Sequence, residues 1–176
     1  DPVPGPGEVR IRAEACGINF ADLMARIGLY PDAPPIPCVV GYEASGTVDA
    51  VGAGVTDLAV GTRVAALTRF SGYSSSLVVP RAQAQTIADH VSFESAAAVP
   101  TTYLTAWMML VYLGNLRPGD KVLVHAAAGG VGQSALQICL HKGAEVIGTA
   151  SAGKHDRLRE MGCHHCIDYR TQDFET

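Results

Sequence analysis

A glycine-rich turn between an apolar run and a helical pattern is the stretch of this sequence best suited to chemistry. Ala127, Gly129 and Gly132 have the spacing of a Gly-x-Gly-x-x-Gly dinucleotide fingerprint, with alanine in the first position. Glycines at 129, 130 and 132 allow a tight turn and the close approach of bare backbone to a pyrophosphate. The helix that follows directs its unpaired N–H groups at that anion. The spacing predicts that a dinucleotide binds to Ala127, Gly129, Gly130, Val131 and Gly132.

The elements around this turn are those that the fingerprint requires. Val122 to Val124 is an apolar run that follows a turn at 117–120 and predicts a buried strand. Apolar residues then recur at helical spacing over 131–142, and a second strand is expected over 144–150. A strand, a glycine turn, a helix and a strand in this order predict the beginning of a Rossmann domain. The alternative is a glycine-rich corner that binds nothing.

The end of the second expected strand indicates which dinucleotide fits. NAD enzymes usually place a carboxylate there to bind the ribose hydroxyls, and the stretch 148–154 contains none. It carries Ser151 and Lys154 instead, with His155 and Arg157 next along the chain. A hydroxyl and cations suit the 2′-phosphate of NADPH, which a carboxylate would repel. NADPH is the predicted cofactor, with Ser151 and Lys154 as ligands; the alternative is that these cations form a solvated first helical turn.

Composition and charge argue against several other functions. The 176 residues carry a formal net charge of −4 and no basic stripe, so no nucleic acid is expected as a partner. The charge-free span between Glu94 and Arg117 has the length of a membrane helix, but Pro100-Thr101-Thr102 interrupts it. Two buried helices over 93–98 and 103–113 are expected instead, and no integral membrane span. Five cysteines without an export signal indicate a reducing, cytoplasmic environment.

The run Cys163-His164-His165-Cys166 contains residue types that bind metals or carry out redox chemistry. A structural zinc site needs a second pair of ligands at suitable spacing, and none follows. A thioredoxin-type pair opens a helix, whereas this run lies between a helix expected over 154–161 and a strand expected over 166–169. We interpret the run as a helix-to-strand loop, and no metal is expected.

The first hundred residues contain short strands bracketed by turn residues. Residues 8–14 alternate between polar and apolar, as in a half-buried strand. Further strands are expected over 44–51, 63–67 and 76–79, and a short helix over 19–26. Strands so closely spaced predict a small β-barrel or sandwich.

Five ordered motifs, spread from about Pro6 to Asp173, resemble those of a known family. They are Gly17-Ile-Asn-Phe-Ala-Asp22, Arg26-x-Gly28-x-Tyr30-Pro31, Gly41-x-Glu43-x-x-Gly46-x-Val48, Gly61-x-Arg63-Val64 and His125-Ala-Ala-Ala-Gly-Gly-Val-Gly132. Together they are similar to the quinone oxidoreductase branch of the zinc-independent medium-chain dehydrogenase/reductase superfamily. Within that branch, the synaptic-vesicle membrane-protein subgroup and the enoyl reductases of polyketide synthases are especially similar.

The resemblance implies an α+β domain followed by an α/β domain. Residues 1–105 would form a GroES-like β-barrel catalytic domain, and residues 106–176 the first part of a Rossmann domain that binds NADPH, with the substrate in the cleft between them. The implied reaction is hydride transfer to a quinone or an α,β-unsaturated carbonyl. Zinc would take no part, because Asn19 and Tyr42 stand where zinc alcohol dehydrogenases carry cysteine and histidine ligands.

The resemblance also assigns roles to single residues. Asn19 and Tyr30 match family residues that lie over the nicotinamide and the substrate, so both are expected to be catalytic, and Asn19 to bind the cofactor as well. Thr105 and Tyr169 match residues near the nicotinamide and the adenosine phosphate, and are expected cofactor ligands. Each has a plainer alternative: Asn19 as a helix N-cap, Tyr30 as a loop anchor, Thr105 bonding its own helix backbone and Tyr169 as a strand-end aromatic.

Charged side chains are not expected to carry out the chemistry. Glu43 and Arg63 are expected to form a buried pair that holds the barrel together. No side chain stands out as a general acid, so the proton that completes the reduction would come from water or from Tyr30.

The chain is shorter than a complete enzyme of this kind. A Rossmann domain of the first order needs about six strands, and only two and the start of a third are expected here; the chain also begins at Asp1 and not at Met. We therefore expect a fragment of a longer protein, whose family forms homodimers through later strands. Three functions stay open: an NADPH-dependent quinone or enone oxidoreductase, an enoyl reductase domain of a polyketide or fatty-acid synthase, and a vesicle-associated or structural relative that binds NADPH without turnover. The last would allow peripheral association with a membrane.

Overall fold

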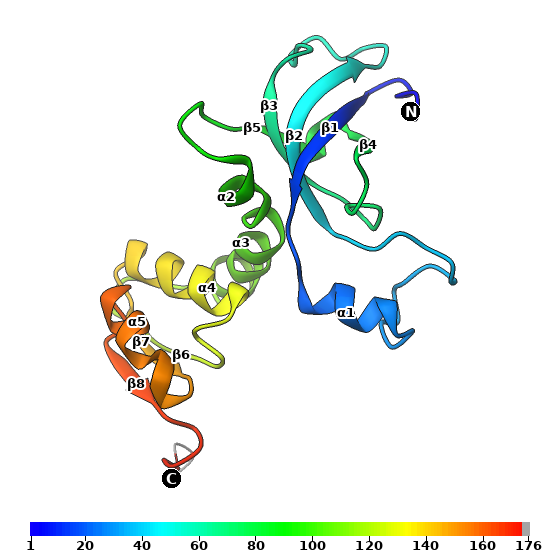
Figure 1. The fold of residues 1–176 in the computed structure, drawn as a ribbon. Helices are drawn as coiled ribbons and strands as arrows, with labels where there is room; N and C mark the ends of the chain where they lie inside the picture. The colour runs from blue at the N-terminus through cyan, green and yellow to red at the C-terminus, as the bar shows by residue number, and fades with distance from the viewer. Residues whose placement is uncertain (174–176) are drawn as a thin grey trace. The chain divides into compact units, whose positions relative to one another are not determined.

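The structure is a computed structural model that describes residues 1–173 of the chain. The chain divides into two compact units, one formed by Asp1–Thr101 and the other beginning at Thr102. Each unit has a sheet and a hydrophobic core of its own (Figure 1). The sheet is antiparallel in the first unit and parallel in the second.

The first unit is built on a five-stranded antiparallel sheet with the spatial order β4-β1-β2-β3-β5. Its strands are β1 (Glu8–Cys16), β2 (Glu43–Val51), β3 (Arg63–Leu67), β4 (Ser76–Pro80) and β5 (Ala84–Thr86). In β1, Val9 and Ile11 are fully buried, while Arg10 and Arg12 between and after them keep access to solvent. The alternation predicted for this strand is therefore confirmed, and it places one face of the sheet in the core.

Short helical segments accompany this sheet: α1 (Phe20–Arg26), the 3-10 turn η1 (Arg81–Gln83) and α2 (Phe93–Ala97). The helix α2 begins where the Ser92 hydroxyl accepts the Ser95 N–H at 3.1 Å, which is the usual bond of a helix N-cap. Both α1 and α2 lie where the sequence predicts helices. The strand β5 was not expected, because its three residues are too few to show an alternation.

The second unit contains a three-stranded parallel sheet in the order β6-β7-β8. Its elements are β6 (Lys121–Val124), α4 (Gly130–His141), β7 (Glu145–Thr149), the 3-10 turn η3 (Ala152–Lys154), α5 (His155–Glu160) and β8 (His165–Ile167). Leu136 and Cys139 of α4 share a core with Val146 of β7, and all three are fully buried. The predicted succession of strand, glycine turn, helix and strand is thus confirmed. Because the strands are parallel, their carboxyl ends lie at one edge of the sheet.

The segment before β6 differs from the helix expected over 103–113. The helix α3 (Pro100–Trp107) starts three residues earlier, and the π-helix η2 (Met108–Leu113) follows it. Proline fits the first turn of a helix because the N–H that it lacks would have no partner there. The charge-free span is divided into two helices as expected, and Pro100 itself begins the second one.

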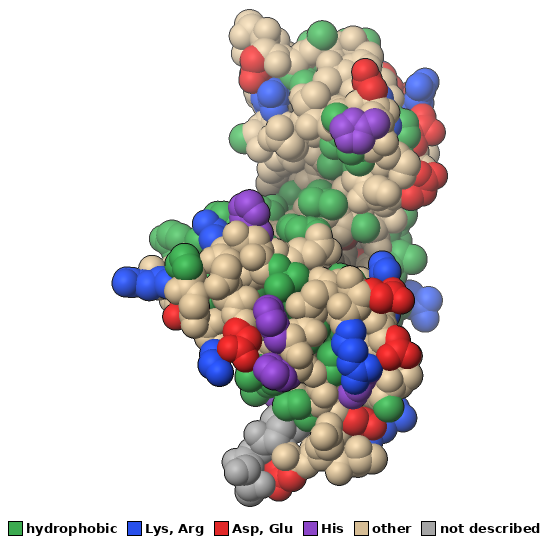
Figure 2. Space-filling model, turned by 90° about the vertical axis from the view of Figure 1, so that its left-hand side faces the viewer, with side chains coloured by type: hydrophobic (Ala, Val, Ile, Leu, Met, Phe, Trp, Pro, Cys, Tyr) green, Lys and Arg blue, Asp and Glu red, His purple; other side chains and the backbone are tan. Residues whose placement is uncertain are grey.

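On the face that Figure 2 shows, acidic and basic side chains alternate without a broad field of one sign. Within residues 1–173 no helix combines the length and the apolar character needed to cross a membrane.

Candidate functional site

The glycine turn between β6 and α4 is held in place by the end of β7. Ala126 adopts a left-handed backbone with a φ of 50°, and its N–H lies 3.3 Å from the Thr149 hydroxyl. The N–H of Ala127 donates to the Thr149 carbonyl oxygen at 3.0 Å, and the N–H of Gly129 closes the turn by donating to the Ala126 carbonyl oxygen at 2.8 Å. The strained residue is thus fixed by bonds on both sides.

The glycines of this turn make close contacts, with backbone atoms at Gly129 and Gly132 and with a side chain at Gly130. A Cβ added at Gly132 would lie 2.7 Å from the Cα of Ala127 and 2.8 Å from its carbonyl carbon, which is too close for any side chain. A Cβ at Gly129 would lie 3.2 Å from the Ala126 carbonyl oxygen, and one at Gly130 would lie 3.0 Å from the Thr102 methyl group. The third glycine of the fingerprint therefore lets the helix pack directly on the turn.

Ala127 takes the place of the first glycine of the fingerprint, and β7 makes room for its methyl group. Ala127 is fully buried, and a Cβ added at Gly148 would lie only 2.8 Å from the Cβ of Ala127. Because residue 148 is a glycine, it leaves the space that the methyl group of Ala127 occupies. Gly148 was not expected to matter, because its only signal in the sequence is an isolated glycine inside a strand.

A cavity of about 520 Å³ opens beside this turn, within the range of small-ligand pockets. Four of the five predicted loop residues line it, and the buried Ala127 lies behind them. The first N–H groups of α4 have no partner within the helix, so they can bind an anion. The lining residues are Met109, Leu110, Val122, Leu123, Val124, His125, Ala126, Gly129, Gly130, Val131, Gly132 and Ala135.

The remaining predicted cofactor ligands follow the neighbouring strands. Ser151 and Lys154 come directly after β7, and Tyr169 comes after β8, so all three lie at the carboxyl edge that also carries the glycine turn. Lys154 is exposed, and Tyr169 is exposed with the Arg170 guanidinium 5.9 Å from its ring centre. Thr105 is exposed on α3 and is not among the residues that line the cavity. The edge therefore brings together every predicted cofactor ligand of the second unit except Thr105.

His155 was expected to lie on the surface with Lys154 and Arg157, but it is buried. Only 8% of it is exposed, and its Nε2 lies 3.0 Å from the Ala150 carbonyl oxygen. Arg157 is exposed but lies 3.5 Å from Glu160 in an ion pair. Lys154 is left as the cation best able to meet a phosphate at this edge.

In the first unit, Asn19 is held through its backbone and through its side chain. It occupies the N-cap position of α1, as the plainer alternative predicted, and its N–H donates to the Asp22 carboxylate at 2.8 Å. Its side-chain amide Nδ2 donates to Glu43 Oε1 at 2.7 Å. Asp22 also accepts the N–H of Gly41 at 3.1 Å and the hydroxyl of Tyr73 at 3.0 Å. Burial and then the bond to Asp22 raise the pKa of Tyr73 to about 12.

The expected pair of Glu43 with Arg63 is wrong. In the antiparallel register of β2 and β3, Glu43 lies opposite Leu67 and Arg63 lies opposite Thr47, so the two charges stand at opposite ends of the strand pair. Glu43 is 1% exposed and bonds Asn19 and the Thr101 N–H, the latter at 2.8 Å. The Arg63 guanidinium lies 4.4 Å from the centre of the Phe93 ring and donates at 2.6–2.9 Å to three carbonyl oxygens, those of Ala88, Asp89 and Val91.

Tyr30 belongs to a small aromatic cluster. Its ring stands edge-on to Tyr42 with 6.0 Å between ring centres, and Tyr42 in turn lies 4.9 Å from Phe70. Burial and then the neighbouring Tyr30 hydroxyl raise the pKa of Tyr42 above its ordinary range. Tyr42 is therefore a neutral phenol at physiological pH. Tyr30 is half-buried in this cluster, and its role in the chemistry stays a prediction.

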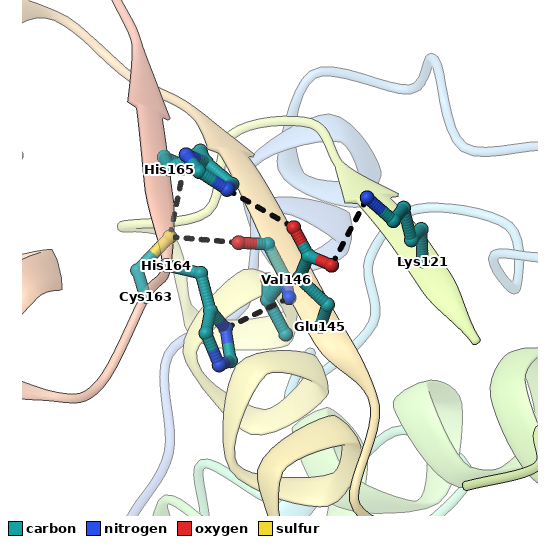
Figure 3. Close-up of polar contacts among 6 residues, drawn as sticks. All are labelled: Lys121, Glu145, Val146, Cys163, His164 and His165. Carbon is teal, nitrogen blue, oxygen red and sulfur yellow. Dashed lines mark hydrogen bonds and ion pairs between the residues drawn. The ribbon is translucent and has the colours of Figure 1, made fainter. Parts of the chain in front are cut away.

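The Cys163–Cys166 run joins β8 to β7 at the amino edge of the sheet, as Figure 3 shows. The Val146 N–H donates to His164 Nδ1 at 3.0 Å, and the Cys163 thiol lies 3.2 Å from the His165 carbonyl oxygen. Burial and then Cys163 raise the pKa of Cys166 to about 11, which keeps this thiol protonated at neutral pH. Within residues 1–173, no three His, Cys, Asp or Glu side chains are grouped so as to hold a metal.

Comparison with known proteins agrees with this geometry. Residues 5–108 match the family model of the alcohol dehydrogenase GroES-like domain. The chain is 51% identical to the synaptic vesicle membrane protein VAT-1 homolog of Rattus norvegicus over 174 residues, which are 98% of this chain and 43% of that protein.

Two solved structures have the same fold over nearly the whole chain. The quinone oxidoreductase of Escherichia coli complexed with NADPH is 37% identical with a TM-score of 0.90, over 98% of this chain and 53% of that one. The CurK enoyl reductase is 36% identical with a TM-score of 0.92, over 97% of this chain and 54% of that one. The chain thus spans about half the length of these solved relatives.

Proposed function

The chain belongs to the alcohol dehydrogenase GroES-like domain family, in its zinc-independent quinone oxidoreductase branch, and from this membership we propose that it serves an NADPH-dependent oxidoreductase. The proposed reaction is hydride transfer to a quinone or to the β-carbon of an α,β-unsaturated carbonyl; NADPH supplies the hydride when bound. The observation that carries the proposal is the turn at 125–132, where close backbone packing and a helix N-terminus meet at a cavity of suitable size.

The coenzyme fits the residues at the carboxyl edge. The N–H groups at the start of α4 would bind the pyrophosphate, because Gly129 and Gly130 leave the backbone bare there. Ser151 and Lys154 would bind the 2′-phosphate of NADPH, since a hydroxyl and an ammonium group both donate to phosphate oxygens. Tyr169 would pack beside the adenosine, and its exposed ring at the end of β8 is available for that contact.

Asn19, Tyr30 and Thr105 would act at the reacting end. Positioning and hydrogen bonds must supply the rate enhancement where no metal polarises the substrate oxygen. Asn19 would orient the nicotinamide ribose or the substrate oxygen, and Thr105 would contact the nicotinamide. Tyr30 would bond the substrate and, where water does not, donate the proton that completes the reduction.

Coenzyme preference tests the proposed binding edge. NADPH and NADH are titrated into the complete protein by calorimetry, together with Lys154→Ala and a matched control, Lys121→Ala, at the opposite edge of the sheet. We expect Lys154→Ala to reduce the preference for NADPH about tenfold, since one charge-assisted bond to phosphate is lost, and Lys121→Ala to leave it unchanged. Equal affinity of the unaltered protein for the two coenzymes would refute the assignment of Lys154.

Turnover separates the enzyme from a protein that only binds the coenzyme. NADPH oxidation by the complete protein is followed with a quinone and with an enone, and with a carrier-bound enoyl thioester to represent the synthase alternative. Oxidation that depends on the acceptor, and that Asn19→Ala strongly reduces, supports the reductase. Tight binding of NADPH without oxidation in any of these mixtures supports a binding protein instead.

A further inference from the structure

Glu43, the first residue of β2, is a buried carboxylate whose two oxygens are both used. Oε1 accepts the side-chain amide of Asn19 at 2.7 Å, and Oε2 accepts the backbone N–H of Thr101 at 2.8 Å in the first turn of α3. Only 1% of Glu43 is exposed. A buried carboxylate is costly unless donors surround it, and here the donors are an amide and a helix N–H group instead of a cation.

Gly17 makes the space for this carboxylate. A Cβ added at Gly17 would lie 2.5 Å from the carboxyl carbon of Glu43 and 2.6 Å from the Ala97 carbonyl oxygen. The Glu43 side chain therefore fills the room that a side chain at 17 would need. Its position relative to Asn19, two residues further along the chain, is fixed by this packing.

The contact with Glu43 determines which end of the Asn19 amide faces the carboxylate. Only Nδ2 can occupy that position, because a rotated amide would place its oxygen against Glu43 Oε1, acceptor against acceptor. The bond is short and charge-assisted, so it holds the amide more firmly than a neutral partner would. Asp22 fixes the Asn19 backbone at the same time.

We propose that Glu43 is a positioning residue for Asn19: the buried carboxylate presets the orientation of the amide that meets the coenzyme or the substrate. The inference rests on the proposed function, in which Asn19 makes that contact. A group that is already oriented needs no reorganisation during the reaction, which is how fixed dipoles accelerate it. Glu43 itself touches neither ligand and transfers no proton.

A double-mutant cycle on the complete protein tests this role. Glu43→Met removes both acceptors at nearly constant volume, and we expect kcat for NADPH oxidation with a quinone to fall about 10- to 100-fold. The same change added to Asn19→Ala should cause no further loss, because the positioned group is already gone. Glu94→Met, the same substitution at an exposed position of α2, should retain kcat. Losses that multiply in the double variant would overturn the proposal.

A spectroscopic measurement tests the contact without turnover. In a proton–nitrogen correlation spectrum, the side-chain amide of Asn19 is identified by its loss in Asn19→Ala, and one of its protons should exchange slowly with solvent. Glu43→Met should remove that protection, and unchanged exchange would overturn the proposal. If Glu43→Met does not fold, Glu43→Leu, which also removes both acceptors, replaces it in both measurements. A protein that keeps this protection but neither binds nor oxidises NADPH would refute the proposed function alone.

Discussion

The candidate residues of the first unit and those of the second are held in opposite ways. Around Asn19, side chains accept the hydrogen bonds that hold the structure. Two buried carboxylates, Asp22 and Glu43, accept hydrogen bonds from residues as far as 58 positions away in the sequence. At the turn over 125–132, backbone hydrogen bonds hold the structure, and glycines stand where a Cβ would lie too close to neighbouring atoms. A backbone site is recognisable in a sequence by its glycines, whereas a side-chain site depends on distances that only the folded sheet provides.

The sharpest test of this contrast is Gly132→Ala, for which we expect the largest effect. The added methyl group would meet the backbone of Ala126 and Ala127, which cannot move aside as a flexible side chain could. We expect a loss of about 1–3 kcal/mol in the free energy of unfolding and a loss of detectable NADPH binding, measured by urea denaturation and by titration.

Gly153→Ala is the matched control, because a Cβ at that position has no heavy atom within 4 Å and the residue has no left-handed backbone. It should leave the free energy of unfolding unchanged. If Gly132→Ala were as stable as Gly153→Ala, the turn would not depend on backbone packing.

Much of the fold follows from the sequence because its signals are local. The alternation in β1, the glycine turn before α4 and the parallel unit after it were all expected from short stretches of chain. The strand β5 and the start of α3 at Pro100 were not, since the three residues of β5 show no alternation and a proline can either interrupt an apolar run or begin a helix.

The candidate site shows the same division. The sequence indicates Gly129, Gly130 and Gly132 by their spacing together with the strand and the helix expected on either side of them. The sequence does not predict the partners of Glu43. These partners depend on the register between β2 and β3 and on the position of α3, and no motif contains that information. Nor does the sequence predict the environment of His155, which lies among cations in the chain but is buried against the end of β7.

A second test, with an intermediate effect, weakens the side-chain hydrogen bonds around Asn19 through Asp22→Asn. The amide has one acceptor end, so it cannot satisfy both the Asn19 N–H and the Gly41 N–H, which bond different oxygens of Asp22. We expect a loss of about 2 kcal/mol in the free energy of unfolding, because a buried donor is left unpaired. Urea denaturation of the complete protein measures it.

The control for Asp22 is Asp32→Asn in the same unit. Asp32 forms an exposed ion pair with Arg69 at 3.0 Å, and such pairs contribute little. Its substitution should change the free energy of unfolding by less than about 0.5 kcal/mol. If the two variants were equally stable, the burial of Asp22 would not explain how much its hydrogen bonds contribute to the free energy of unfolding.

The smallest expected effect is at Glu145, a carboxylate with two partners like Glu43 but on the surface. Its oxygens lie 3.2 Å from Lys121 Nζ and 3.0 Å from His165 Nε2 at the amino edge of the sheet (Figure 3). The bond to Lys121 is the largest influence and lowers the pKa of Glu145 below its ordinary value; desolvation opposes it, and the bond to His165 lowers the pKa further. Stability from a lowered carboxyl pKa is present above the unfolded-state value of about 4.3 and disappears as the pH falls through the folded-state value.

We therefore expect Glu145→Gln to lower the melting temperature slightly at pH 7 and not at all in strong acid or at high salt, where protonation or screening removes the attraction. Melting curves at several pH values and salt concentrations measure this difference. A decrease as large as that of Asp22→Asn, and insensitive to salt, would show that the number of partners matters more than burial for the carboxylates of this protein.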